Sequence, residues 1–246
     1  MSFEFGKQSI DELELVRGEC LKLIGDVKGF CPLGEGQQYP EVFRLMATPI
    51  LYSSWERCFT LCHAIALRVL QHIAQTPNSL TSVQRAIWLM RTPFFNSLHA
   101  SLSESTDKSP KRGHFAALCK FLADFDEWNN CSFDHRADTG ELVMRFSNVN
   151  PEVVELNAEA IGFSKVQKFP SFKYGRLHDL VGQRNGIGHG STIEAPKHAA
   201  FVELIEFTES LINHYCDCAI EWVKEQAGQA STQAEPAAVP SLPEAA

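Results

Sequence analysis

Apolar residues recur every three or four positions along most of this chain, and this helical period constrains its fold more than any other feature. The clearest case is the segment 41–74, whose apolar positions include Leu51, Trp55, Cys58, Phe59, Cys62, Ile65, Ala66, Val69 and Ile73. Its proline, Pro49, should kink or split the helix. A second stripe near the end consists of Phe201, Leu204, Ile205, Leu211, Ile212, Tyr215, Ala219 and Trp222. We therefore predict an all-α fold in which both segments bury one face.

Further helices are expected around the first long segment. Ser9 and Glu12 have the spacing of a capping box, which predicts a helix that opens there and runs to about Val27. Residues 80–102 are expected to form one helix, bent at Pro93. Residues 114–128 also have the helical period and predict another helix.

The second half of the chain continues the pattern after one irregular stretch. Residues 130–148 lack the helical period, and we allow a small β-hairpin there. Asn150 followed by Pro151 is a favourable helix start. A helix from about Tyr174 is expected next, and Pro196 is well placed as the first residue of the last long helix.

Length and charge limit the class of protein. A chain of 246 residues with 44% hydrophobic residues fits one globular domain, which we assign to residues 1–226. Residues 227–246 are rich in Ala, Pro, Gln and Ser, and we expect them to be a disordered tail. The formal net charge of −8 argues against a broad nucleic-acid-coating surface, but it leaves room for a local cationic pocket.

The location of the protein is predicted from what the sequence does not contain. The stretch Met1–Phe5 has no basic region followed by an apolar one, so no export signal is visible. No run approaches the roughly 20 apolar residues of a membrane-spanning helix. We expect a soluble, cytoplasmic protein.

The eight cysteines are scattered, and none forms a CxxC pair. A tetrahedral zinc site therefore has little support, and we expect no metal and no cofactor. Cys58, Cys62 and His63 have a helical spacing that suits two ligands, but packing of buried thiols is favoured. Cys216 and Cys218 are two positions apart and do not share a helix face, so they are interpreted in the same way.

The segment Arg184-Asn185-Gly186-Ile187-Gly188-His189-Gly190 is the main candidate for chemistry. Guanidinium binds phosphate bidentately, and imidazole exchanges a proton near neutral pH. On a regular helix Arg184 and His189 would lie roughly 140° apart, so they converge only if the helix distorts or if two subunits combine. The alternative is structural: the glycines form a helix C-cap, His189 interacts with terminal carbonyls and Arg184 is a surface ion-pair partner.

The order of these features along the chain resembles the HEPN superfamily (higher eukaryotes and prokaryotes nucleotide-binding domain), in particular its stand-alone prokaryotic nucleases. The resemblance rests on Trp55-Glu56, on the helix from Asn150-Pro151 to Gly162-Phe163, and on Leu180–Gln183 followed by Arg184–Gly190. It is clearest over residues 141–223. Where this family branch has Ala before the histidine, this chain has Gly188. The resemblance implies an up-and-down helical bundle with extra N-terminal helices.

The resemblance also implies a reaction. Such nucleases cut RNA without a metal: the ribose 2′-hydroxyl attacks the phosphorus and leaves a cyclic phosphate. His189 would take the 2′-OH proton or protonate the leaving oxygen. Arg184 would hold the phosphate, and Asn185 would orient the imidazole or the substrate. The family generally forms homodimers with both motifs in one cleft, and its members commonly act as toxins, with an antitoxin partner, or in defence against phage.

Other residues have weaker assignments. Glu56 is expected to orient Arg184, and the alternative is an ordinary surface glutamate. The polar stretch 101–113 is interpreted as a loop whose cations guide RNA or are simply solvated. With the histidine that follows, these loop residues are Lys108, Lys111, Arg112 and His114. The alternative function is a non-catalytic module that binds nucleotide, RNA or a partner protein; a purely structural helical domain is a third reading.

Overall fold

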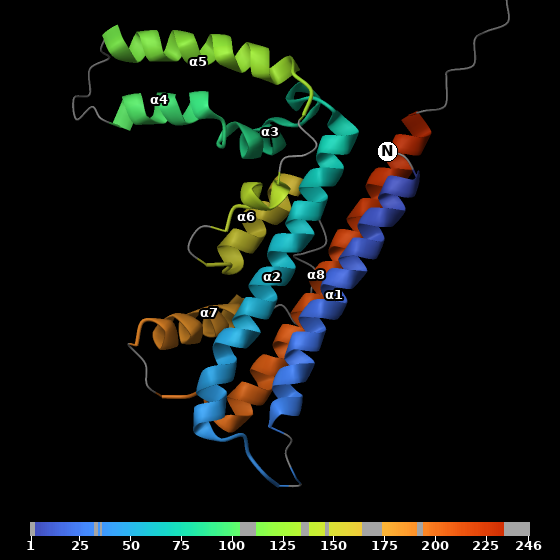
Figure 1. Ribbon diagram of the computed structural model, residues 1–246, viewed down its shortest axis with the longest axis vertical. Coiled ribbons are helices and arrows are strands. Elements are labelled where there is room, and N and C mark those ends of the chain that lie inside the picture. Colours follow the sequence, from blue (N-terminus) through green and yellow to red (C-terminus); the bar gives the residue numbers. More distant parts are fainter. Residues whose placement is uncertain are drawn as a thin grey trace, which may run out of the picture.

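The computed structural model describes residues 3–31, 34, 36–103, 112–133, 138–145, 148–163, 174–190 and 194–233. Within these ranges the structure is all-α, as predicted. Three long helices lie side by side and form the main body (Figure 1). They are α1 (Phe3–Phe30), α2 (Glu41–Ala74) and α8 (His198–Gln233). Helix α1 runs antiparallel to α2 and α8, which point the same way (Figure 1).

The core lies between these three helices and contains the two stripes predicted from the sequence. Its largest fully buried side chains include Trp55, Tyr52 and Phe59 from α2 and Tyr215 and Phe201 from α8. Aromatic residues bury the most apolar area per side chain, which explains why the two stripes pack face to face.

The start of α1 differs from the prediction. Ser9 does not cap the helix, because α1 already begins at Phe3. The Ser9 hydroxyl instead donates to the carbonyl of Phe5, 2.9 Å away and one turn back along the helix. A serine bonded in this way satisfies its own polar group inside a helix, so the capping-box pattern was wrong here.

Proline has different effects in α2 and in the region after it. Helix α2 continues through Pro49 and is not split there. Pro93, by contrast, separates two helices that we expected as one: α3 (Ser82–Leu89) and α4 (Pro93–Ser103). A proline disfavours helical backbone in the residue before it, and the Thr92 hydroxyl caps the new helix by accepting from the amide of Phe95 at 3.3 Å.

Helices α3 and α4 are followed by α5 (Arg112–Asn130), which includes the predicted segment 114–128. Helices α4 and α5 pair with each other and project sideways from the long helices (Figure 1). A short 3-10 helix, η1 (Pro77–Ser79), links α2 to this region.

The predicted β-hairpin within 130–148 is not formed by the described residues. A short 3-10 helix, η2 (Thr139–Leu142), occupies part of this stretch. The backbone of Met144 pairs with the side chain of Asn157 through both its amide, at 3.3 Å, and its carbonyl, at 2.8 Å. Because a side chain satisfies both groups, no partner strand is needed.

The remaining helices follow the predicted starts closely. Helix α6 (Pro151–Ile161) is capped by Asn150, which accepts from the amide of Val153, and it ends at Gly162 in the left-handed region. Helix α7 spans Tyr174–Gly188. Helix α8 begins two positions after Pro196 and continues to Gln233, so it includes the first residues of the expected tail; residues 234–246 lie outside the described ranges.

Candidate functional site

Arg184 and Asn185 lie in the last turns of α7, on a helix anchored by buried Leu177 and Leu180. The amide of His189 still donates to the carbonyl of Asn185 at 2.9 Å, which continues the helical hydrogen-bond pattern. Gly190 follows with φ of +66°, the left-handed conformation that commonly ends a helix. The glycine-containing end of the motif is therefore a helix C-cap, as the structural alternative proposed.

The Arg184 guanidinium is partly buried and has neutral partners. Its Nη1 donates to Asn185 Oδ1 at 2.9 Å and lies 3.4 Å from Asn148 Oδ1. Its Cζ lies 5.1 Å from the centre of the Tyr52 ring, which is a cation–π contact. Among the described residues no carboxylate forms an ion pair with it. Two amide oxygens and an aromatic face orient the cation without neutralising it, which is the arrangement that an anion would complete.

The acceptor Asn148 is held in place from the core. The amide of Val149 donates to the Tyr52 hydroxyl at 2.9 Å, and Trp55 Nε1 donates to the Val149 carbonyl at 3.2 Å. Both aromatic side chains are essentially fully buried on α2. Helix α2 thus fixes the peptide of Val149 and, with it, the neighbouring side chain that contacts Arg184.

Glu56 lies one turn beyond Tyr52 on α2 and forms no ion pair with Arg184. The two charges instead act on the same hydroxyl. Burial raises the pKa of Tyr52; the hydrogen bond from Val149 lowers it, Glu56 raises it and Arg184 lowers it. The expected direct support of Arg184 by Glu56 therefore remains a prediction of the resemblance.

His189 is exposed and lies just beyond α7. Since the helical pattern continues up to its amide, Arg184 and His189 point roughly 140° apart around the helix axis. No contact joins the two side chains in the described structure. Asn185 was expected to orient the imidazole or the substrate, but its side-chain oxygen accepts from Arg184.

Of the four predicted RNA-guiding residues, two lie on the described helix α5. Lys108 and Lys111 lie outside the described residues, and Arg112 begins α5, although its side chain is not described. His114 is partly buried on α5. In Figure 1 helix α5 lies at the top and α7 in the lower half of the molecule, with α6 between them, so α5 does not adjoin the helix that carries Arg184.

Sequence reasoning missed Tyr52 and Asn148. Tyr52 is four residues before Glu56 on the same helix, so the face that carries the predicted glutamate could have pointed to it. Asn148 gave no such signal, because it lies in the irregular stretch before α6. One group of potential metal ligands is found in the described residues, and it lies between α2 and α8 rather than beside Arg184.

Comparisons with protein-family models, with curated proteins and with solved structures gave no significant match. The described helices also lack the combination of length and apolar character that crossing a membrane requires.

Proposed function

We propose that this protein is a metal-independent endoribonuclease of the HEPN type. The observation that carries the proposal is the partly buried Arg184, whose partners among the described residues orient its charge but do not neutralise it. A phosphodiester would supply the missing negative charge, and the guanidinium would stabilise the charge that builds on the phosphoryl oxygens during cleavage.

The proton transfers are assigned to His189. The 2′-hydroxyl oxygen attacks phosphorus as one imidazole accepts its proton, and the 5′-oxygen leaves with a proton from another. Because Arg184 and His189 diverge on one helix, the proposal requires two copies of the chain around one cleft.

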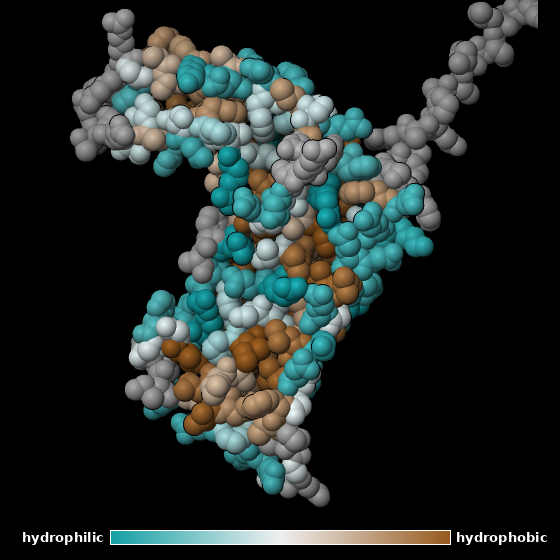
Figure 2. All heavy atoms as spheres, in the orientation of Figure 1, coloured by the Kyte–Doolittle hydropathy of each residue, from teal (hydrophilic) through white to brown (hydrophobic). Residues whose placement is uncertain are grey.

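An exposed apolar stripe on α2 supports a homodimer. Val42, Met46 and Ile50 are spaced one turn apart and are 67%, 67% and 39% exposed. Hydrophobic side chains gather over this end of α2 in Figure 2, on the part of the helix near α7. A stripe this exposed is favourable to cover, and a second copy would cover it close to Tyr52 and Arg184.

The biological role follows only from the resemblance. We propose a cytoplasmic toxin or phage-defence effector that acts on RNA, with an antitoxin or defence partner that restrains it.

The test is cleavage of single-stranded RNA by purified protein in EDTA. The wild type should produce cyclic phosphate ends, whereas Arg184→Ala and His189→Ala should each lower the rate at least about 100-fold. Matched controls are available on α7 itself: Arg176 is paired with Glu203, and His178 lies 3.3 Å from Glu152. Arg176→Ala and His178→Ala should keep the activity. Equal rates for the wild type and both motif variants would refute the nuclease.

A second function, anion or RNA binding without catalysis, is favoured by one observation. Of the two motif residues, Arg184 is held by hydrogen bonds to asparagine side chains, whereas His189 is exposed. A binding module predicts no cleavage, loss of RNA binding in Arg184→Ala and unchanged binding in His189→Ala. Fluorescence anisotropy with a labelled single-stranded RNA distinguishes the two functions.

A further inference from the structure

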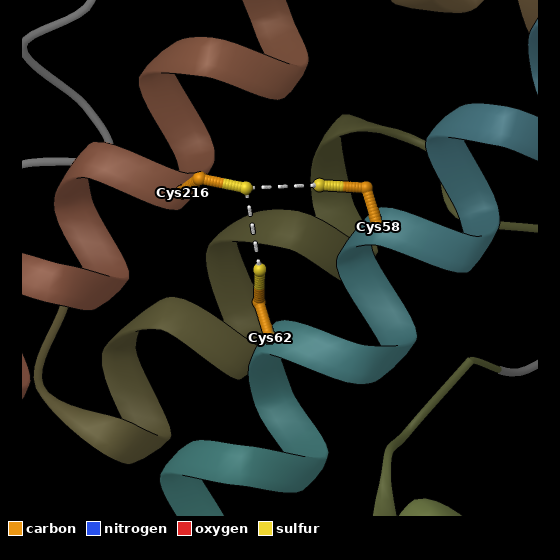
Figure 3. A group of neighbouring side chains, drawn as sticks. All are labelled: Cys58, Cys62 and Cys216. Atoms are coloured by element: carbon orange, nitrogen blue, oxygen red, sulfur yellow. Dashed lines mark hydrogen bonds between the residues drawn. The ribbon is translucent and has the colours of Figure 1, made fainter. Parts of the chain in front are cut away.

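Three buried thiols meet in the core between α2 and α8 (Figure 3). Cys58 and Cys62 are one turn apart on α2, and Cys216 faces both from α8. The Sγ–Sγ distances are 3.6 Å from Cys58 to Cys216 and 3.8 Å from Cys62 to Cys216. All three sulfurs lie within 4.8 Å of one another.

These distances match a shared metal centre. With metal–sulfur bonds of about 2.3 Å, the sulfurs of a tetrahedral thiolate site are about 3.8 Å apart. A disulfide would require about 2.05 Å, so the three residues are free thiols in the structure. Three buried sulfurs that converge on one point from two helices at this spacing occupy three corners of such a site.

The surroundings of Cys216 favour its deprotonated form. Hydrogen bonds from Cys58 and Cys62 lower the pKa of Cys216 to about 4, and the nearby Arg17 guanidinium lowers it further against the effect of burial. The pKa values of Cys58 and Cys62 are raised, with hydrogen bonds to other thiols as the first cause. Cys216 thus lies beside two thiols and an arginine, surroundings that also suit the thiolate form in which cysteine binds a metal.

Cys20 adds a fourth sulfur from α1, which packs against both α2 and α8. It is 1% exposed on α1, and its interaction with the Cys58 thiol lowers its pKa. Its sulfur lies outside the three-member group, so it would complete a tetrahedron by a change of side-chain rotamer.

We propose that Cys58, Cys62 and Cys216 bind a divalent thiophilic ion such as Zn²⁺, with Cys20 as the fourth ligand. The ion would displace the remaining thiol protons to solvent, and no oxidation is involved. Arg17 would offset part of the negative charge of the thiolates. All ligands are buried and no position is left open, so the site would be structural and would cross-link α1, α2 and α8.

The absence of CxxC pairs argued against a metal site in the sequence, because the CxxC pattern describes ligands on tight turns. On a helix, residues four apart face the same side, so Cys58 and Cys62 form a ligand pair of a different spacing. The partner, Cys216, is brought to them only by the packing of α8 on α2.

The test uses full-length reduced protein, unfolded and refolded with Zn²⁺ or Co²⁺ because the ligands are buried. The wild type should retain one ion per chain through gel filtration and should gain the thiolate-to-metal charge-transfer absorption of tetrahedral Co²⁺. Its Tm should rise with free Zn²⁺. Cys62→Ala and Cys216→Ala should lose the ion and the absorption, and Cys20→Ala should lose the tetrahedral spectrum.

Cys218→Ala is the matched control, because Cys218 is buried on the same helix and its sulfur lies 3.4 Å from His214 Nε2 instead. It should bind metal as the wild type does. Failure of the refolded wild type to retain metal would overturn the proposal, whatever happens to the folding of the variants. Equal loss in Cys218→Ala and Cys216→Ala, or a Cys58–Cys216 disulfide in mass spectra of protein kept reduced, would also overturn it.

Discussion

At the residue scale, the peptide of Val149 connects the core to the candidate site. The Tyr52 hydroxyl accepts a hydrogen bond from the amide of Val149, and Trp55 Nε1 donates one to its carbonyl. Two buried aromatic residues thus satisfy both polar groups of one loop residue. The adjacent Asn148 then lies near Arg184, while the ring of Tyr52 packs under the same guanidinium. Tyr52 therefore has two separable roles, one for its hydroxyl and one for its ring.

Replacing Tyr52 with Phe should separate these roles. The substitution leaves the buried amide of Val149 without an acceptor, which costs about 1–3 kcal/mol of unfolding free energy. The aromatic face stays, so RNA or phosphate binding through Arg184 should fall less than in Tyr52→Leu, which also loses the cation–π contact. Urea denaturation and anisotropy measure the two effects.

Tyr39→Phe is the control, because the Tyr39 hydroxyl has no hydrogen bond to the described residues. It should change stability by less than about 0.5 kcal/mol. Equal losses in the two variants would show that the hydroxyl of Tyr52 does not support Val149.

At the scale of elements, the contact between α2 and α8 contains polar groups inside an apolar core. Nε2 of His63 on α2 is hydrogen-bonded to the hydroxyl of Tyr215 on α8, one residue away from the thiol group in each helix. Burial lowers the pKa of His63 to about 3, and it raises the pKa of Tyr215. Both side chains are therefore neutral at physiological pH.

The neutral state of His63 predicts acid sensitivity. The unfolded chain protonates this histidine near pH 6.5, whereas the folded chain resists protonation until about pH 3. The unfolded state binds more protons between these values, so stability is lost as the pH falls below about 6.5, by up to about 1.4 kcal/mol per pH unit. His63→Gln should flatten this dependence in denaturation curves between pH 7 and pH 4.5.

His178→Gln, at an exposed position on α7, serves as the comparison substitution. A His63→Gln protein with the full wild-type slope would show that carboxylates or other groups dominate the acid response.

The sequence predicted elements well where their limits depend on nearby residues. The bounds of α2 and the Asn150 cap of α6 follow from local pattern and capping chemistry. Pro93 was misjudged because a bend and a break have the same sequence signature until Thr92 is seen to cap a new helix. The hairpin was wrong because the partner of Met144 is a side chain on α6.

The candidate site was predicted only in part, for a related reason. Arg184 and Asn185 were found because they are neighbours in the motif. Asn148 lies 36 positions from Arg184, and Tyr52 is on a different helix. Such contacts arise from tertiary packing, which helical period and motif spacing do not encode. The cysteine group was missed in the same way.

At the scale of the whole molecule, α2 is the element that most others share. It packs against α1 and α8 in the body and contacts α6, α7 and η2 on its other sides. Only its first turns present a large apolar stripe to solvent, formed by Val42, Met46 and Ile50. If two copies associate there, the two α7 helices that carry Arg184 come close to the shared surface.

Met46→Glu should therefore weaken assembly. In the dimer, the Met46 side chains of both copies would be buried, and the substitution would place two charges in this apolar contact. The dimer dissociation constant should therefore rise at least about 10-fold. Size-exclusion chromatography with light scattering, over a range of concentrations, measures this change.

Leu15→Glu is the control, since Leu15 is 63% exposed on α1, away from the stripe. It should sediment and elute as the wild type does. A wild-type chain that stays monomeric at all concentrations, or an unchanged Met46→Glu dimer, would rule out this interface.

The segment Asn148–Val149–Asn150 has a consequence for how such a chain can change. Its three residues contact the arginine, bond to buried aromatic side chains and cap α6, in that order. The effect of a mutation in the buried core would thus reach the polar surface around Arg184, although the mutated residue does not contact that surface. Selection for a durable core and selection for anion recognition would act on the same aromatic pair, so drift at Tyr52 or Trp55 would need a compensating change in the loop.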